Sequence, residues 1–198
     1  MEISKPGDEY LDTEQLRNDL EAFLNQPGPS AQPPCPNCQQ HIPSQCTAEC
    51  PDVASALSID PDNHPIEPNM VPMVFELMST NMLHTSWSCE GHLNSEDELW
   101  KSPNVSFYSK SAFYPHLLLK HLANLKHSNR LHYAWQIVLG DYGQTWGVTY
   151  CIQPDLSKEQ DIHLGKLQMD LRAIADDMFN NLKIIARKIL HEINKRHS

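Results

Sequence analysis

The sequence predicts an α+β fold in which helices cover a mostly antiparallel four-stranded sheet. Four short segments alternate apolar and polar residues, which is typical of half-buried strands, and a helical segment separates them into two pairs. A long C-terminal segment instead repeats its apolar residues every three or four positions, which indicates a helix. Because strands and helices do not alternate one by one along the chain, the pattern favours an antiparallel sheet with helices packed against it.

Residues 1–34 form an acidic helical leader and a linker. Asp12 can cap a short helix, and the prolines and glycine of residues 27–34 end that helix. We expect the helix to dock on the main body of the protein through one apolar face. That face consists of Leu16, Leu20, Phe23 and Leu24.

A small Cys-rich module is predicted over residues 35–57. Four of the six cysteines and one histidine follow the pattern C-x2-C-x2-H-x4-C-x3-C within sixteen residues. Such a cluster is typical of a tetrahedral zinc site. Four thiolates would close the coordination sphere, and a closed site is structural rather than catalytic. The predicted ligands are Cys35, Cys38, Cys46 and Cys50, with His41 in reserve.

Two alternatives to zinc stay open for this cluster. An iron–sulfur cluster also takes four thiolates, but the spacing of these cysteines does not match the ferredoxin patterns and therefore favours zinc. Disulfides would require an oxidising compartment, whereas the N-terminus carries no apolar signal segment. The sequence also contains no run of 18 apolar residues, so no membrane span is predicted. We therefore expect a cytoplasmic protein with reduced, metal-binding cysteines.

The net charge of −10 is distributed unevenly along the chain. Residues 1–100 hold 17 acidic and 2 basic residues, whereas residues 101–198 hold 8 acidic and 13 basic residues. An acidic N-terminal half repels phosphate backbones, so we do not expect nucleic-acid binding. The basic residues near the C-terminus complement the dipole of the predicted last helix.

Residues 58–68 contain three prolines and are predicted to be a second connector, and residues 69–198 form the α+β domain. The domain begins with a helix for which Asn69 is the expected N-cap, with Pro72 in its first turn. A second helix is predicted over residues 112–127.

The four strands of this domain are predicted over residues 85–89, 104–109, 132–139 and 145–152. The sequence Gly-Asp-Tyr-Gly separates the last two strands, so we expect them to form a hairpin.

The final helix is predicted to run from about residue 158 to residue 196. An unbroken helix of this length spans roughly 57 Å, which is more than a domain of this size needs. We expect either a break near Asn180 and Asn181 or a projecting helix that pairs with a second copy in a homodimer. Packing of this helix across the sheet is the favoured arrangement.

The segment Cys89-Glu90-Gly91-His92 is the strongest candidate for a reactive site. It follows directly on a predicted strand, and Gly91 permits a sharp turn there. Cys89 and His92 can form an activated thiol or half of a second metal site, while Glu90 can orient the imidazole or act as a general base. The structural alternative is a buried cysteine beside a turn glycine and surface histidines. Two histidines of the following helix can converge on the same place, namely His116 and His121.

Three functions therefore stay open. The first is a cytoplasmic zinc protein with a structural metal, whose sheet domain recognises a small-molecule ligand or a protein partner. The second is a hydrolase or transferase with Cys89, Glu90 and His92 as catalytic residues. The third is metal handling or thiol redox sensing by the Cys cluster itself. A closed four-ligand site favours the first function.

Overall fold

The computed structural model describes residues 13–25, 57–58, 60, 62–80, 82–109, 111–140 and 148–196. The predicted ligands Cys35, Cys38, His41, Cys46 and Cys50 lie outside these ranges. The division of the chain into a leader, a Cys-rich module, a connector and an α+β domain stays a prediction.

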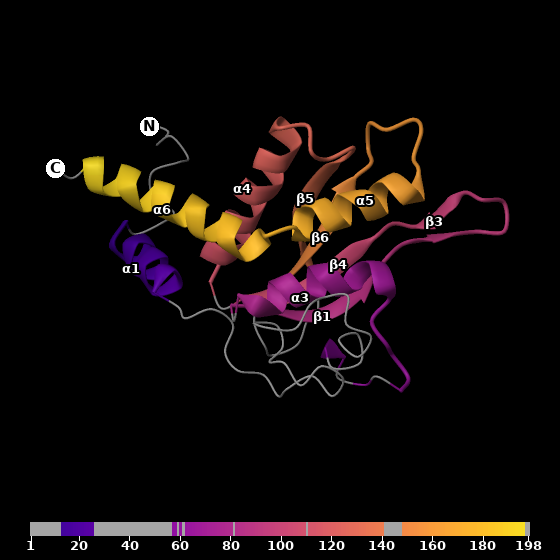
Figure 1. The fold of residues 1–198 in the computed structure, drawn as a ribbon, viewed down its shortest axis with the longest axis horizontal. Helices are drawn as coiled ribbons and strands as arrows, with labels where there is room; N and C mark the ends of the chain where they lie inside the picture. Colours follow the sequence, from indigo (N-terminus) through magenta and orange to yellow (C-terminus); the bar gives the residue numbers. More distant parts are fainter. Residues whose placement is uncertain are drawn as a thin grey trace, which may run out of the picture.

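A four-stranded antiparallel sheet forms the centre of the described structure, which confirms the predicted α+β fold (Figure 1). Its spatial order is β1-β4-β6-β5. The strands are β1 (Leu83–Cys89), β4 (Asn104–Ser109), β5 (Ala134–Gly140) and β6 (Thr149–Asp155).

The bounds of the last two strands differ from the prediction. Strand β5 begins at Ala134, and β6 extends to Asp155 instead of ending at residue 152. The extension passes through Pro154, which pairs with Trp135 of β5. The pairing of β6 with β4 already ends at Ile152, so the missing N–H of the proline interrupts no hydrogen bond on that side.

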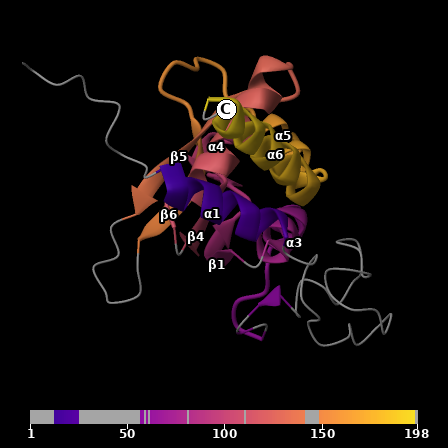
Figure 2. The ribbon, with the colours of Figure 1, turned by 90° about the vertical axis from the view of Figure 1, so that its left-hand side faces the viewer.

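The helices gather on one side of the sheet, as Figure 2 shows for α3 (Val71–Ser79), α5 (Leu164–Ala175) and α6 (Met178–Arg196). Helix α4 (Phe113–His127), which confirms the predicted second helix, packs beside them against β5. Val105, Phe107 and Ile152 point to this side and are fully buried, because the helices remove their side chains from water. No helix among the described residues is long and apolar enough to cross a membrane.

The predicted leader helix is present as α1 (Thr13–Leu24), and it docks against α6 (Figure 1). Leu20 and Phe23 are buried, and the ring of Phe23 meets that of Phe179 edge-on at 6.0 Å. The expected docking through the apolar face is therefore confirmed. The expected cap, Asp12, lies outside the described residues.

The predicted C-terminal helix is two helices, α5 and α6, and the break lies at Asp176 and Asp177 rather than near Asn180 and Asn181. Asp177 has a φ of +52°, a left-handed conformation that ends a helix and that aspartate tolerates better than most residues. The Asp177 carboxylate then accepts a hydrogen bond from Asn180 Nδ2 at 2.6 Å. The break allows apolar residues of both helices to reach the core. The homodimer through the C-terminal helix stays a prediction.

The first helix of the domain starts later than predicted, because a 3-10 turn, η1 (Pro68–Met70), precedes α3. The N-cap of α3 is Met70, so the assignment of Asn69 as N-cap is wrong. Asn69 instead forms hydrogen bonds with Glu90 and Arg172. Its backbone N–H donates to Glu90 Oε2 at 3.0 Å, and its side-chain oxygen accepts from Arg172 Nη2 at 2.9 Å.

A small hairpin that we did not predict joins β1 to β4 and projects from one end of the molecule (Figure 1). It consists of β2 (His92–Leu93) and β3 (Leu99–Lys101). The side chain of Asn94 shapes its turn by accepting hydrogen bonds from the N–H groups of Glu96 and Glu98, both at 2.9 Å. Two-residue and three-residue strands show too little alternation to be recognised in a sequence.

Glu76 gives the contact between α3 and α6 a pH dependence. Its carboxylate accepts the Phe179 N–H at the start of α6 at 3.1 Å. Burial raises the pKa of Glu76 above its usual 4.5, the Phe179 hydrogen bond lowers this pKa, and the charges of Asp177 and Asp176 raise it. The folded chain therefore binds the proton more readily than the unfolded chain. The resulting stabilisation is complete below pH 4.5 and is lost as the pH rises through the folded-state pKa.

We expect Glu76→Gln, which keeps an oxygen acceptor and removes the charge, to be more stable than the wild type at pH 7. At pH 4 the advantage should shrink to within about 0.5 kcal/mol, because the glutamate is then mostly protonated in both states. Urea unfolding at the two pH values measures the difference, with Glu192→Gln on the exposed side of α6 as the control. An equal difference at both pH values would contradict this account of Glu76.

Candidate metal centre

Strand β1 positions Cys89, the first candidate ligand, at the sheet's end. A β-bulge between Thr85 and Trp87 shifts the register of β1 against β4, so that Thr85 pairs with Phe107 but Trp87 pairs with Ser106. The bulge thereby turns Trp87 and Cys89 to the face opposite the helices. The Cys89 side chain is only 2% exposed there.

Gly91 returns the chain so that His92 comes close to Cys89. Its φ of +86° is a left-handed conformation that glycine adopts without strain. A Cβ atom at this position would lie 2.7 Å from Leu164 Cδ1 and 2.8 Å from Pro103 Cδ. The tight turn therefore depends on both the backbone freedom and the small size of glycine.

Glu67 completes a group of three potential metal ligands with Cys89 and His92. One ligand atom from each residue, a carboxylate oxygen, Sγ and a ring nitrogen, lies within 4.8 Å of the other two. The Nε2 atom of His92 lies 3.0 Å from Glu67 Oε1. The structure thus brings together the predicted Cys89 and His92 and adds a carboxylate from the connector before η1.

A pair of reciprocal hydrogen bonds holds Glu67 against the β1–β2 turn. The Glu90 N–H donates to Glu67 Oε2 at 2.6 Å, while Glu90 Oε2 accepts the Asn69 N–H. Helix α5 supports this arrangement through Arg172, which donates to the Asn69 side chain. The Glu67 carboxylate is therefore oriented before any ligand arrives.

Glu90 does not orient the imidazole, contrary to the prediction, because its carboxylate contacts the backbone of Asn69 and the His92 ring is paired with Glu67. The expected convergence of two histidines from α4 is also wrong. His121 is buried with its Nε2 2.9 Å from Ile174 O, and neither His121 nor His116 belongs to the group of ligands. Burial lowers the pKa of His121, the Ile174 hydrogen bond raises it and the charge of Arg130 lowers it.

Sequence reasoning missed Glu67, which is 22 residues before Cys89 in a connector without periodicity. One signal was present, since Glu67 lies directly before Pro68 and close to Pro65. Prolines stiffen a connector and can present a polar side chain in a defined direction. The two prolines indicate an ordered segment, but they do not indicate which residues the Glu67 carboxylate contacts.

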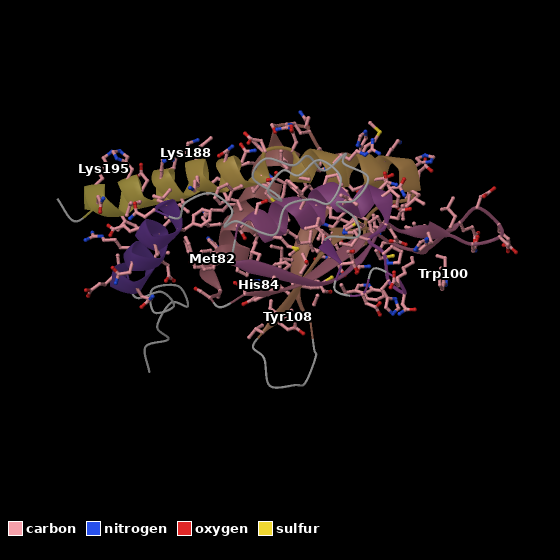
Figure 3. All side chains as sticks on the ribbon, turned by 60° about the horizontal axis from the view of Figure 1, so that its bottom comes forward. Met82, His84, Trp100, Tyr108, Lys188 and Lys195 are labelled. Atoms are coloured by element: carbon pink, nitrogen blue, oxygen red, sulfur yellow. The ribbon has the colours of Figure 1, made fainter. Side chains whose placement is uncertain are left out.

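The three side chains differ in their exposure to solvent. Cys89 lies at the base of the group, whereas the side chains of His92 and Glu67 are 41% and 31% exposed. The exposed ring of Trp100 lies beside that of His92, with 6.5 Å between ring centroids. Figure 3 shows Trp100 at the end of the molecule opposite Lys195. The group is therefore closed on the cysteine side and open to solvent on the histidine and glutamate side.

This donor set suits a zinc ion, which accepts thiolate, imidazole and carboxylate ligands. Donor atoms in a tetrahedral zinc site are roughly 3.4 Å apart, as bond lengths of about 2.0–2.3 Å require. The distance of 3.0 Å between His92 Nε2 and Glu67 Oε1 is shorter than this value, and all three donor atoms lie within 4.8 Å of one another. Small side-chain shifts would therefore bring the three donor atoms to tetrahedral spacing. Three ligands leave a fourth position for water or a substrate.

Comparisons of the chain with models of protein families, with curated proteins and with solved structures find no match.

Proposed function

We propose that Glu67, Cys89 and His92 bind a zinc ion and that the protein is a zinc-dependent hydrolase. The observation that supports this function is the approach of three different ligand atoms to within 4.8 Å of one another at a site that opens to solvent. Three protein ligands and one open position are typical of catalytic zinc, whereas structural zinc has four protein ligands. Zinc lowers the pKa of a bound water molecule to about 7, which supplies hydroxide for hydrolysis at neutral pH.

Each ligand has a distinct role in this proposal. Cys89 supplies a thiolate from the buried side, and His92 and Glu67 coordinate from the open side. Glu67 can bind the metal through Oε1 while Oε2 keeps its hydrogen bond from the Glu90 N–H. Such support of a ligand by a neighbouring group fixes its orientation and strengthens metal binding. Two anionic ligands also neutralise the divalent ion.

The proposal includes a second zinc ion, bound in the Cys-rich module by Cys35, Cys38, Cys46 and Cys50. The assignment of this second ion rests on the spacing of the cysteines alone. We propose a structural role for this metal and a cytoplasmic location for the protein.

A thiol hydrolase is the second candidate function. The 3.0 Å contact between His92 Nε2 and Glu67 Oε1 favours it, because a nucleophilic cysteine needs an imidazole that a third group orients. The burial of Cys89 argues against it, since a substrate carbonyl must reach the sulfur itself. A metal ion bound between the three side chains is reached from the open side without exposing the sulfur.

Zinc content tests the metal centre. We expect two zinc ions per wild-type chain, one in Cys35→Ser, and one in the double variant Cys89→Ser, His92→Ala. Two matched controls should keep both ions. Cys151→Ser removes another described thiol, and His163→Ala removes an exposed histidine whose Nε2 pairs with Asp161 at 3.1 Å. Inductively coupled plasma mass spectrometry of untagged protein gives the stoichiometry. The proposal is wrong if the double variant holds as much zinc as the wild type.

Hydrolysis of p-nitrophenyl acetate tests the reaction. Activity of the zinc-loaded wild type should exceed that of the double variant by about 100-fold or more, because metal-bound hydroxide supplies several kcal/mol of transition-state stabilisation. Removal of zinc with a chelator should abolish the activity, and added zinc should restore it. Activity that survives zinc removal but is lost on alkylation of Cys89 would establish the thiol hydrolase instead.

A further inference from the structure

The face of the sheet opposite the helices carries a shallow groove of about 580 Å³. This volume lies within the range of sites for small-molecule ligands. Polar side chains of β4 and β6 form its floor, and an aromatic ring and an ammonium group flank them. The lining includes Trp87, Lys101, Asn104, Ser106, Cys151 and Gln153.

The groove adjoins the candidate metal centre through the register of the strands. Asn104, which lines the groove, pairs with Cys89, and Lys101 pairs with His92. Side chains of directly paired residues have Cβ atoms about 5 Å apart on the same face of a sheet. Trp87 and Cys89, two residues apart beyond the bulge, also share this face. A molecule in the groove would therefore lie next to the strand positions that carry Cys89 and His92.

The charge of the groove differs from that of the whole chain. The protein has a net charge of −10, yet the described residues that line the groove include the cation Lys101 and no Asp or Glu. Partial burial raises the pKa of Cys151 and its hydrogen bond with Ser106 lowers this pKa, so the half-buried thiol adds no negative charge near pH 7. The neighbouring centre, once it holds a divalent ion, is formally neutral. The groove therefore favours an anion.

Trp87 and Lys101 form a combined recognition element. The Trp87 side chain is 53% exposed, and the Lys101 ammonium lies 5.2 Å from the centroid of its ring. An exposed indole ring offers a flat surface on which a planar ligand can stack. Because the Lys101 side chain is flexible, its ammonium can move from the ring face to the ring edge and pair there with an acidic substituent of a stacked ligand. Asn104, Ser106 and Gln153 add polar contacts along the floor.

We propose that this groove binds a small molecule in which an anionic group is attached to a planar unsaturated ring. The further assignment of such aromatic acid derivatives as the substrates of the hydrolase depends on the proposed metal centre. The preference of the groove for an aromatic anion rests on its own lining.

Binding of 2-naphthoate by the zinc-loaded full chain tests this proposal, with the neutral 2-naphthamide as the matched ligand. Isothermal titration calorimetry should show naphthoate binding at least about tenfold more tightly than the amide, because only naphthoate pairs with Lys101. Lys101→Met and Trp87→Leu should each weaken naphthoate binding by about tenfold or more. Controls away from the lining, Lys188→Met on α6 and Leu119→Ala on the exposed side of α4, should change the affinity less than about twofold.

Three results would overturn the proposal: no naphthoate binding, equal affinity for the amide, or equal losses in the control variants. Circular dichroism of each variant establishes that it is folded before its affinity is compared. Zinc content of the same samples separates this proposal from the previous one. Absence of zinc from the Glu67 group would overturn the proposed hydrolase. A zinc-loaded chain that does not bind naphthoate would overturn only the proposed ligand of the groove.

Discussion

Asp170→Ala is expected to lower the free energy of unfolding by about 3–5 kcal/mol, since it removes a fully buried carboxylate from its partners. Oδ1 of Asp170 accepts the His132 N–H at 2.8 Å and lies 2.8 Å from His132 Nδ1. Oδ2 accepts the Tyr133 N–H at 2.9 Å and Trp135 Nε1–H at 3.1 Å. This single side chain therefore joins α5 to the start of β5. Alanine would leave all these donors buried or half-buried without an acceptor.

Two further variants make the Asp170 prediction specific. Asp170→Asn should be almost as damaging as alanine, because the amide NH₂ group would face two donors in place of one carboxylate oxygen. Asp161→Ala should change the stability by less than about 1 kcal/mol, since its carboxylate is 82% exposed and, among the described residues, pairs with His163 alone. Urea unfolding measures all three variants. A loss below about 1 kcal/mol for Asp170→Ala would refute the role of this carboxylate as a tie between α5 and β5.

Gly91→Ala is expected to cost about 2–4 kcal/mol and to weaken zinc binding at the Glu67 group. Alanine at a φ of +86° carries about 1–2 kcal/mol of backbone strain. The new Cβ would also lie 2.8 Å from Pro103 Cδ, and a proline ring cannot rotate away as a flexible side chain can. Relief of this overlap must move the turn that carries Glu90 and His92. The substitution therefore affects stability and the spacing of the ligands together.

Gly165→Ala is the matched control for this prediction. A Cβ atom at Gly165 meets nothing within 4 Å, and the residue lies in α5, where alanine is the better helix former. We expect this variant to be as stable as the wild type or to gain up to about 1 kcal/mol. Thermal unfolding gives the stability, and competition with a chelator gives the zinc affinity. Unchanged values of both in Gly91→Ala would show that the turn tolerates a side chain.

The sequence predicted those features that neighbouring residues encode. Alternation identified the four strands of the sheet, and the apolar face of the leader identified α1 together with its docking. Cys89, Gly91 and His92 were recognisable because all of them lie in one four-residue segment at the end of a strand. The helix break was expected but misplaced, since Asp177 in a left-handed conformation resembles any other aspartate in a sequence.

Long-range geometry accounts for what the sequence did not predict. The role of Glu67 depends on a hydrogen bond to the backbone of Glu90, and a backbone N–H leaves no signature in a sequence. The position of Asn69 likewise depends on Arg172, which is 103 residues away. Separations of this kind are closed only when the elements pack together.

The sequence by itself determined the α+β class, the antiparallel pairing of neighbouring strands and the chemical nature of the segment around Cys89. Local periodicity and turn chemistry suffice for these features, since they act over a few residues. Only the tertiary structure decided which carboxylate meets His92 and which face of the sheet carries Trp87 and Cys89. Simple alternation would keep Thr85 and Trp87 on one face, but the bulge in β1 separates them. The candidate site therefore depends on strand register and packing, which are properties of the whole fold.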